Sequence, residues 1–65
     1  MNAFVKVLES PICGFDIVFV LQSGSEVRYS SVFCRREDAE AFAERANRLG
    51  ISEIHIPEVI EDAIL

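Results

Sequence analysis

Over much of the first half of the chain, every second position is largely apolar while the positions between mix apolar and polar residues, and a period of two is that of a strand. The pattern covers residues 3–8, 15–22 and 26–33, and these ranges are rich in β-branched and aromatic side chains. Gly14 lies in the loop between the first two ranges, and Gly24 lies in a short polar loop between the last two. The sequence therefore predicts three strands, the last two of which form a hairpin.

The period changes to steps of three and four over residues 36–49, where the apolar positions form one stripe of an amphipathic helix. Glu37 and Asp38 fall in the first turn, where negative charge suits the helix dipole, and Gly50 follows the last turn as a cap. Alanines in the stripe allow the helix to approach a sheet closely. We expect Phe42 to anchor it there.

A fourth strand is predicted for residues 51–56, with Ile54 and Ile56 on one face, and Pro57 ends it. Residues 58–65 then separate apolar from acidic positions as a short helix does. Eight residues are too few for an isolated helix, so this one must dock on the rest of the domain. The side chains expected to dock it are Val59, Ile60 and Ile64.

The element order predicts a single α+β domain over residues 1–65. It contains a small mixed sheet of three to four strands with one main helix packed on one face, and a short C-terminal helix. The sheet is expected to be mixed because a right-handed helical crossover makes the third and fourth strands parallel.

Both faces of this sheet carry apolar side chains. Those expected beneath the main helix are Phe15, Ile17, Phe19, Val27, Tyr29 and Phe33, which meet Phe42 and Leu49. Those expected on the opposite face are Phe4, Leu8, Val18, Val20 and Val32. Because a monomer does not leave such a face bare, the C-terminal helix, a second subunit or a target is expected to cover it.

The net charge changes this picture, because it is concentrated at one end. The first fifty residues hold seven acids and six bases, whereas residues 51–65 hold four acids and neither Lys nor Arg, so they supply −4 of the total of −5. A field of one sign on a small surface selects the partners that approach it, and here it predicts a basic one. A sequence pI near 4.6 argues against direct binding to nucleic acid, whose phosphates require Lys and Arg.

The acids of the C-terminal helix share one face. On a helix, Glu61 and Asp62 follow Glu58 by about 4.5 and 6 Å along the axis, spacings comparable to those between phosphates of a nucleic acid. Such an array can imitate nucleic acid in a basic groove if other acids share the surface. The predicted partner-binding residues are therefore Glu37, Glu40, Glu44, Glu53, Glu58, Glu61 and Asp62.

No group of residues suggests catalysis, a cofactor or a metal. His55 has no orienting group beside it in the sequence, and Cys13, Cys34 and His55 lack the four ligands and paired spacing of structural zinc. Cys34 precedes the main helix and two arginines, which would favour its thiolate, so it is either a redox thiol or a partly buried cysteine at a strand end. We expect a protein that is not an enzyme.

The longest aliphatic and aromatic run covers residues 17–21, far short of the roughly 20 residues that cross a bilayer. The first residues lack the pattern of a secretory signal. We therefore expect a cytoplasmic protein without a membrane partner, with both cysteines as free thiols.

The segment from Phe33 to Glu44 looks like the strand-to-helix junction of short phage and bacterial ββαβ domains. In size, charge and lack of an active site, the whole chain resembles the small acidic proteins of phages and mobile elements, among them anti-CRISPR proteins. That resemblance implies an inhibitor that binds a CRISPR effector complex. Two alternatives stay open: a homodimeric structural or regulatory module that pairs through Val18, Val20 and Val32, and a thiol redox protein that uses Cys34.

Overall fold

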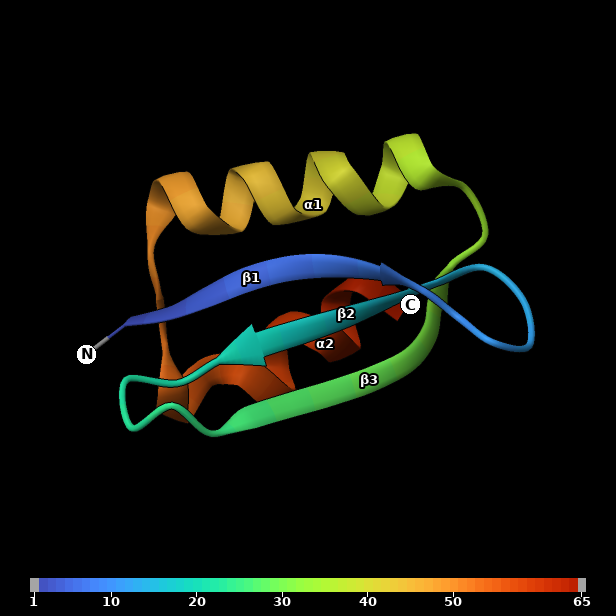
Figure 1. Ribbon diagram of the computed structural model, residues 1–65. Coiled ribbons are helices and arrows are strands. Elements are labelled where there is room, and N and C mark those ends of the chain that lie inside the picture. The colour runs from blue at the N-terminus through green and yellow to red at the C-terminus, as the bar shows by residue number, and fades with distance from the viewer. Residues whose placement is uncertain (1, 65) are drawn as a thin grey trace.

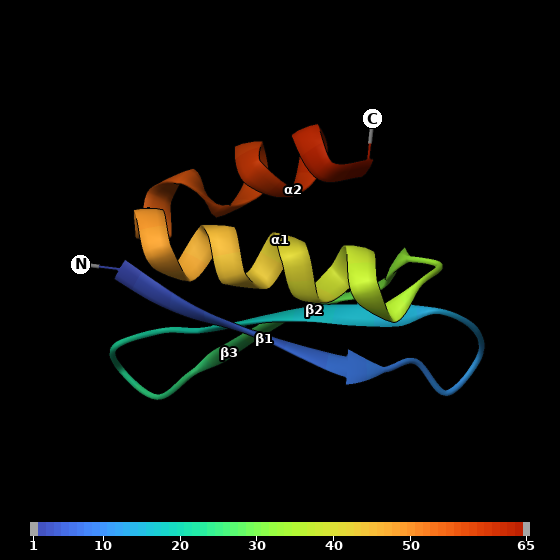
Figure 2. The same cartoon turned by 90° about the horizontal axis from the view of Figure 1, so that it is seen from above.

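A four-stranded antiparallel sheet, covered on one face by two helices, makes up the computed structural model, which describes residues 2–64 (Figures 1 and 2). The predicted α+β class is confirmed, as are the bounds of the main helix. The elements are β1 (Asn2–Glu9), β2 (Phe15–Val20), β3 (Glu26–Phe33), α1 (Arg36–Leu49), β4 (Ile51–Ser52), the 3₁₀ turn η1 (Glu53–His55) and α2 (Ile56–Ile64).

The strand order is β3-β2-β1-β4, and every neighbouring pair is antiparallel. The expected mixed sheet is therefore wrong, because β4 pairs with β1 at the edge farthest from β3. Ala3 lies opposite Ile51 in this pairing. The physical reason is the course of α1, which lies over β1 and returns the chain to the free edge of that strand (Figure 1).

The fourth strand is also shorter than predicted. It ends at Ser52, and the chain continues as η1 with Ile54 exposed and Ile56 buried at the start of α2. Beyond Ala3, the edge of β1 is bonded by a side chain: the carboxamide of Asn47 on α1 forms hydrogen bonds with both backbone groups of Val5. A longer β4 would compete with Asn47 for this edge.

The core lies between the sheet and the two helices. Ala39, Ala43 and Ala46 bring α1 close to the sheet, and the rings of Phe33 and Phe42 lie 5.5 Å apart, as the predicted anchor requires. Leu49 was expected in this core but is exposed at the end of α1. The buried side chains of the core are Ala3, Val5, Ile17, Phe19, Ala39, Ala43, Ala46, Ile51, Ile56 and Ile60.

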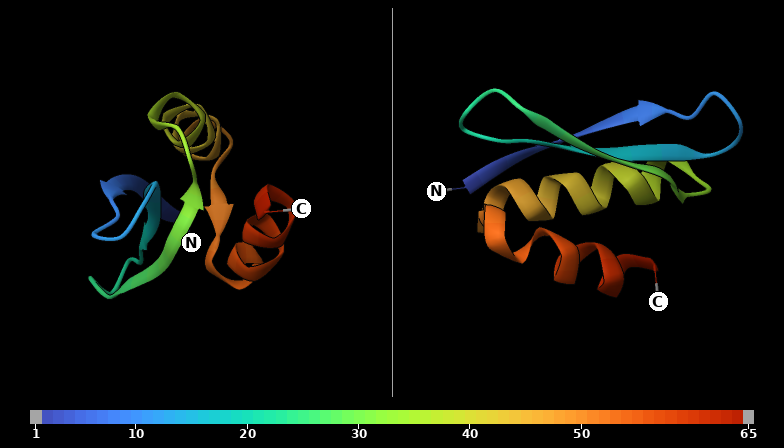
Figure 3. Two further views of the ribbon diagram at one scale, coloured as in Figure 1. Left: turned by 90° about the vertical axis from the view of Figure 1, so that its right-hand side faces the viewer. Right: turned by 90° about the horizontal axis from the view of Figure 1, so that it is seen from below.

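Helix α2 covers the same face of the sheet as α1, as Figures 2 and 3 show. Ile56 and Ile60 dock it and are each 4% exposed, whereas Ile64 is 62% exposed, so the expected docking role of Ile64 is wrong. Val59 packs against the core in part. Leu65, the last residue of the predicted helix, lies outside the described residues. Because α2 lies on the same face as α1, it leaves the opposite face of the sheet uncovered.

That outer face is covered largely by its own charged side chains. Val18 in β2 is 0% exposed although no helix lies over it. Its cross-strand neighbours are Lys6 and Arg28, whose aliphatic stems can shield an apolar neighbour while their charged ends reach water. Lys6 pairs with Glu26 at 3.2 Å. Phe4 remains 59% exposed at one end of the face.

Asp16 is a buried acid on this outer face and is 1% exposed. Its Oδ1 accepts a hydrogen bond from the Ser31 backbone N–H at 2.8 Å, and its Oδ2 lies 2.6 Å from both Nε and Nη2 of Arg28. The Ser31 hydrogen bond lowers the pKa of Asp16; burial raises it, and the hydrogen bond and charge of Arg28 lower it further. The net effect is a lowered pKa, so Asp16 is a structural carboxylate.

Strand β3 bulges opposite Asp16. The register passes from Ile17 opposite Tyr29 to Phe15 opposite Phe33, and Ser31 within the bulge has φ of 52°. Because these extra residues break the alternation, Val32 packs against the core instead of lying on the outer face. Its predicted place is therefore wrong.

Candidate partner-binding surface

Helix α2 presents its three acids to solvent because its apolar side is held in the core. Ile60 is buried, while Glu58, Glu61 and Asp62 are exposed. Pro57 lies in the first turn, where a missing backbone N–H costs no helical hydrogen bond. The predicted acidic face of the C-terminal helix is thus present in the fold, although the helix begins two residues earlier than expected.

Ion pairing divides the acids of the chain into two groups. Each acid before residue 51 has a Lys or Arg nitrogen within 4.0 Å, and within residues 2–64 no acid after residue 50 has one. Glu58 has only the imidazole of His55, whose Nδ1 is 3.8 Å away. The paired acids are Glu9, Asp16, Glu26, Glu37, Asp38, Glu40 and Glu44.

The pairing matters most for the acids of α1 that were predicted to bind a partner. Glu37 lies 3.4 Å from Arg35, Glu40 3.5 Å from Arg36, and Glu44 3.2 Å from Arg48. Residues 35–48 hold four arginines and four acids, so this segment has no net charge. At distances beyond a Debye length of about 8 Å, such exposed pairs present little field.

Among the described residues, Glu53 belongs to the group without a Lys or Arg partner but differs from the acids of α2. It lies in η1, where one carboxylate oxygen accepts a hydrogen bond at 3.2 Å from the backbone N–H of Gln22 in the loop between β2 and β3. This bond ties η1 to the hairpin loop. Glu53 therefore contributes charge to the C-terminal region and also fixes the start of α2.

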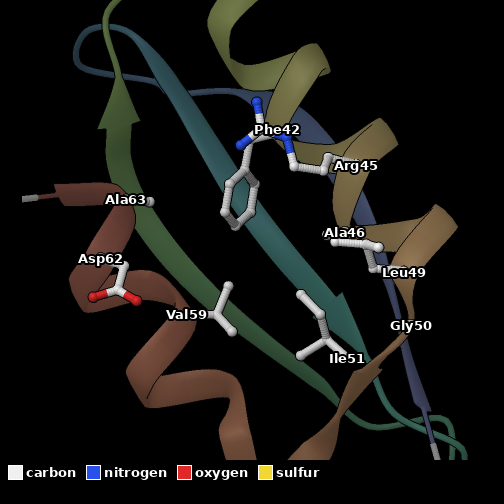
Figure 4. A pocket seen from close by; sticks show the side chains of 9 residues that line it. All are labelled: Phe42, Arg45, Ala46, Leu49, Gly50, Ile51, Val59, Asp62 and Ala63. Atoms are coloured by element: carbon white, nitrogen blue, oxygen red, sulfur yellow. The ribbon is translucent and has the colours of Figure 1, made fainter.

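An apolar groove of about 340 Å³ runs between α1 and α2 beside the acids (Figure 4). Phe42, Ile51 and Val59 point into it, while Arg45 of α1 and Asp62 of α2 lie on its opposite sides. The two helices are therefore not packed together along their full length. Sequence reasoning missed this groove, because its walls come from segments whose relative placement the pattern does not determine.

Arg45 differs from the other cations of the chain. Among the described residues, it is the one Lys or Arg with no acid within 4.0 Å. The sequence carries a signal for this, since the helix positions three and four residues away are Ala41, Phe42, Arg48 and Leu49, none of them acidic. Arg45 was not among the predicted site residues.

Of the residues considered for chemistry, His55 lies in η1, which is hydrogen-bonded to the loop between β2 and β3, whereas Cys13 and Cys34 lie near the other end of β2. His55 is exposed beside Glu58, while Cys13 and Cys34 are exposed free thiols at loops next to the sheet. Within residues 2–64 there is no group of three or more His, Cys, Asp or Glu side chains placed to hold a metal ion.

No helix formed by residues 2–64 has the length and apolar character needed to cross a membrane. Comparison with known proteins gives no matching family model, no matching curated protein and no matching solved structure. The surface is therefore interpreted from its own geometry and charge.

Proposed function

We propose that this chain is a non-catalytic binding protein that uses the acids of α2 to bind and inhibit a basic protein or nucleoprotein. The observation that carries the proposal is the unpaired charge of the C-terminal region. Among residues 2–64, Glu61 and Asp62 have no Lys or Arg within 4.0 Å, whereas every acid of the first fifty residues has one. The three acids of α2 thus place −3 of the total net charge of −5 on one short helix.

The geometry of α2 suits a row of cations. Helix geometry sets Glu58 and Glu61 about 4.5 Å apart along the axis, and Asp62 about 6 Å from Glu58. Lys and Arg side chains that line a nucleic-acid groove meet phosphates at comparable separations. We infer that the partner uses such a groove, and a CRISPR effector complex inhibited by nucleic-acid mimicry is the specific form of this proposal.

The paired acids of α1 have a lesser role in this proposal. Glu37, Glu40 and Glu44 would have to give up arginine partners on α1 or at its N-cap before they could bind a cation of a partner. Exposed pairs of this kind contribute about 0.3–0.5 kcal/mol each, so their loss is a small cost, but the net field around α1 stays near zero. We therefore assign the main contact to Glu58, Glu61 and Asp62.

Affinity capture from a cell lysate with three forms of the protein tests the proposal. The baits are the wild type, a triple variant of α2 (Glu58→Gln, Glu61→Gln, Asp62→Asn) and a matched triple variant of α1 (Glu37→Gln, Glu40→Gln, Glu44→Gln). Both variants lose three negative charges, so they have the same net charge. We expect the wild type and the α1 variant to retain one partner that the α2 variant loses; equal capture by all three forms contradicts the proposal.

Homodimerisation through the outer sheet face is a second candidate, favoured by the exposure of Phe4 and Leu8 there. The face expected to pair is altered, since Val18 is fully buried and Val32 packs toward the core. Phe4→Asp should then halve the mass measured in solution by light scattering. A wild type that already has the mass of one chain removes this candidate.

A further inference from the structure

Cys13 and Cys34 are 21 residues apart in the sequence but lie at the same end of the sheet. Phe15, the first residue of β2, is the register partner of Phe33, the last residue of β3, so Gly14 and Cys34 lie just beyond this pair. A Cβ atom built on Gly14 would be 3.6 Å from the Cys34 Cα, which puts the two Cα atoms within about 5 Å of each other. Cys13 is the residue next to Gly14, and both thiols are exposed.

The loop that carries Cys13 is held against β3 by hydrogen bonds. The Ser31 hydroxyl donates to the Cys13 carbonyl at 3.0 Å, and the hydroxyls of Ser10 and Ser31 are 3.2 Å apart. Within the loop, the Ser10 backbone N–H donates to the Gly14 carbonyl at 3.0 Å. Ser31 adopts φ of 52° to make these contacts, a conformation that costs a non-glycine residue free energy.

Gly14 allows the loop to come this close. It has φ of 71°, and a Cβ there would lie 2.4 Å from the Phe33 carbonyl oxygen, which is backbone and cannot turn aside. Residues 11–14 and 34–35 are bends outside the strands, so the loop that carries Cys13 can adjust without breaking the sheet. A disulfide requires that the two Cα atoms lie within about 7 Å of each other. The Cα of Cys13 is about 3.8 Å from that of Gly14, so an adjustment of the loop can bring it within this distance of the Cys34 Cα.

We propose that Cys13 and Cys34 form a reversible intramolecular disulfide by exchange with a small disulfide such as oxidised glutathione. One cysteine thiolate attacks a sulfur of glutathione disulfide and releases one glutathione thiolate. The second cysteine then attacks the protein sulfur of the mixed disulfide and releases the other. The protein loses two electrons and two protons, and glutathione disulfide gains them as two glutathione thiols.

The product would fasten the loop between β1 and β2 to the segment that leads into α1. This site does not involve the acids of α2, so the result of its test does not depend on the proposed function. It also differs from a single redox thiol at Cys34, because both cysteines are consumed together.

The test incubates the reduced, folded protein with mixed reduced and oxidised glutathione and measures intact mass after acid quenching. We expect a monomer lighter than the reduced chain by two hydrogen atoms. At millimolar glutathione, the amount of this species should exceed that of glutathione adducts by about tenfold, since a fixed neighbouring thiol has a higher effective concentration than the glutathione in solution. Cys13→Ser and Cys34→Ser should each stop at one glutathione adduct. Both positions are exposed, so these variants are expected to fold.

The same reaction in concentrated guanidinium chloride separates native geometry from the flexibility of the chain. If the fold brings the thiols together, the ratio of disulfide to adduct is higher in the folded protein, and the oxidised form unfolds at a higher urea concentration. A folded protein that carries two glutathione adducts, or that forms the disulfide less readily than the unfolded chain, overturns the proposal.

Discussion

The side chain of Asn47 takes the place of a strand beside Val5. Its Oδ1 accepts a hydrogen bond from the Val5 backbone N–H at 2.8 Å, and its Nδ2 donates to the Val5 carbonyl at 2.9 Å, across 42 residues of sequence. Because buried backbone groups are costly to leave unpaired, this one carboxamide both joins α1 to the sheet and extends the bonding of β1 beyond the end of β4.

Replacing Asn47 by Ala should destabilise the protein by about 1–3 kcal/mol, because both backbone groups of Val5 lose their partner. The free energy of unfolding in urea measures the effect. Glu44→Ala, an exposed change on the same helix, is the control and should cost about 0.5 kcal/mol or less. An Asn47→Ala variant as stable as this control would show that water replaces the carboxamide without loss.

The Asp16 carboxylate should make stability depend on pH below its ordinary pKa of 3.8. Since the pKa is lowered in the folded state, the stabilising contribution is fully present above 3.8 and is lost as the pH falls through the folded value. Asp16→Asn lacks this contribution. The gap in urea midpoint between wild type and Asp16→Asn should therefore shrink as the solution is acidified below that value.

Glu9→Gln provides the comparison for this pH series, because Glu9 is paired with Arg36 at an exposed site. Its urea midpoint should follow that of the wild type across the same pH range. A gap between wild type and Asp16→Asn that stays constant down to the acid transition would contradict the structural role of the buried carboxylate.

The docking of α2 predicts unequal effects of two isoleucines on one helix. Ile60→Ala should cost about 2–5 kcal/mol, because it leaves a cavity in the core, whereas Ile64→Ala should change stability by about 0.5 kcal/mol or less. Amide hydrogen exchange along α2 should also be faster in Ile60→Ala. Equal effects of the two substitutions would mean that α2 is not seated as the structure has it.

Two glycines with positive φ should respond differently to alanine. Gly24→Ala meets no atom within 4 Å and bears only the cost of its φ of 94°, about 1–2 kcal/mol. Gly14→Ala carries a similar cost and in addition a 2.4 Å approach to the Phe33 carbonyl oxygen, which should add about 1–3 kcal/mol. Urea unfolding of the two variants compares them directly, and a Gly14 variant no less stable than the Gly24 variant contradicts the close contact.

Local signals in the sequence predict much of this fold. The bounds of α1 follow from its apolar steps and from the acids of its first turn. The alternation over residues 3–8 puts Ala3 and Val5 on the face opposite to Phe4 and Leu8, and both are buried. Glu44 and Arg48 are four residues apart on α1, so the helix brings them together, and they lie 3.2 Å apart. These features depend on residues that are close in sequence.

Features that depend on distant residues could not be predicted in this way. The end of β4 at Ser52 reflects the hydrogen bonds of Asn47 with Val5, and the place of Val32 reflects the bulge that Ser31 forms opposite Asp16. The acidic face of α2 was visible in the sequence, because it rests on helical spacing alone. The arginine partners of the acids on α1 were partly visible, since several lie one helical turn away.

The central claim is that the acids of α2, and not those of α1, bind the partner. The most direct measurement is the Kd of the purified complex at low and at physiological salt, for the wild type and for the two matched triple variants. The claim predicts that the α2 variant binds about tenfold more weakly and has a smaller salt dependence, while the α1 variant stays within about threefold of wild type. Equal losses in the two variants, or an α2 variant with unchanged Kd, would contradict it.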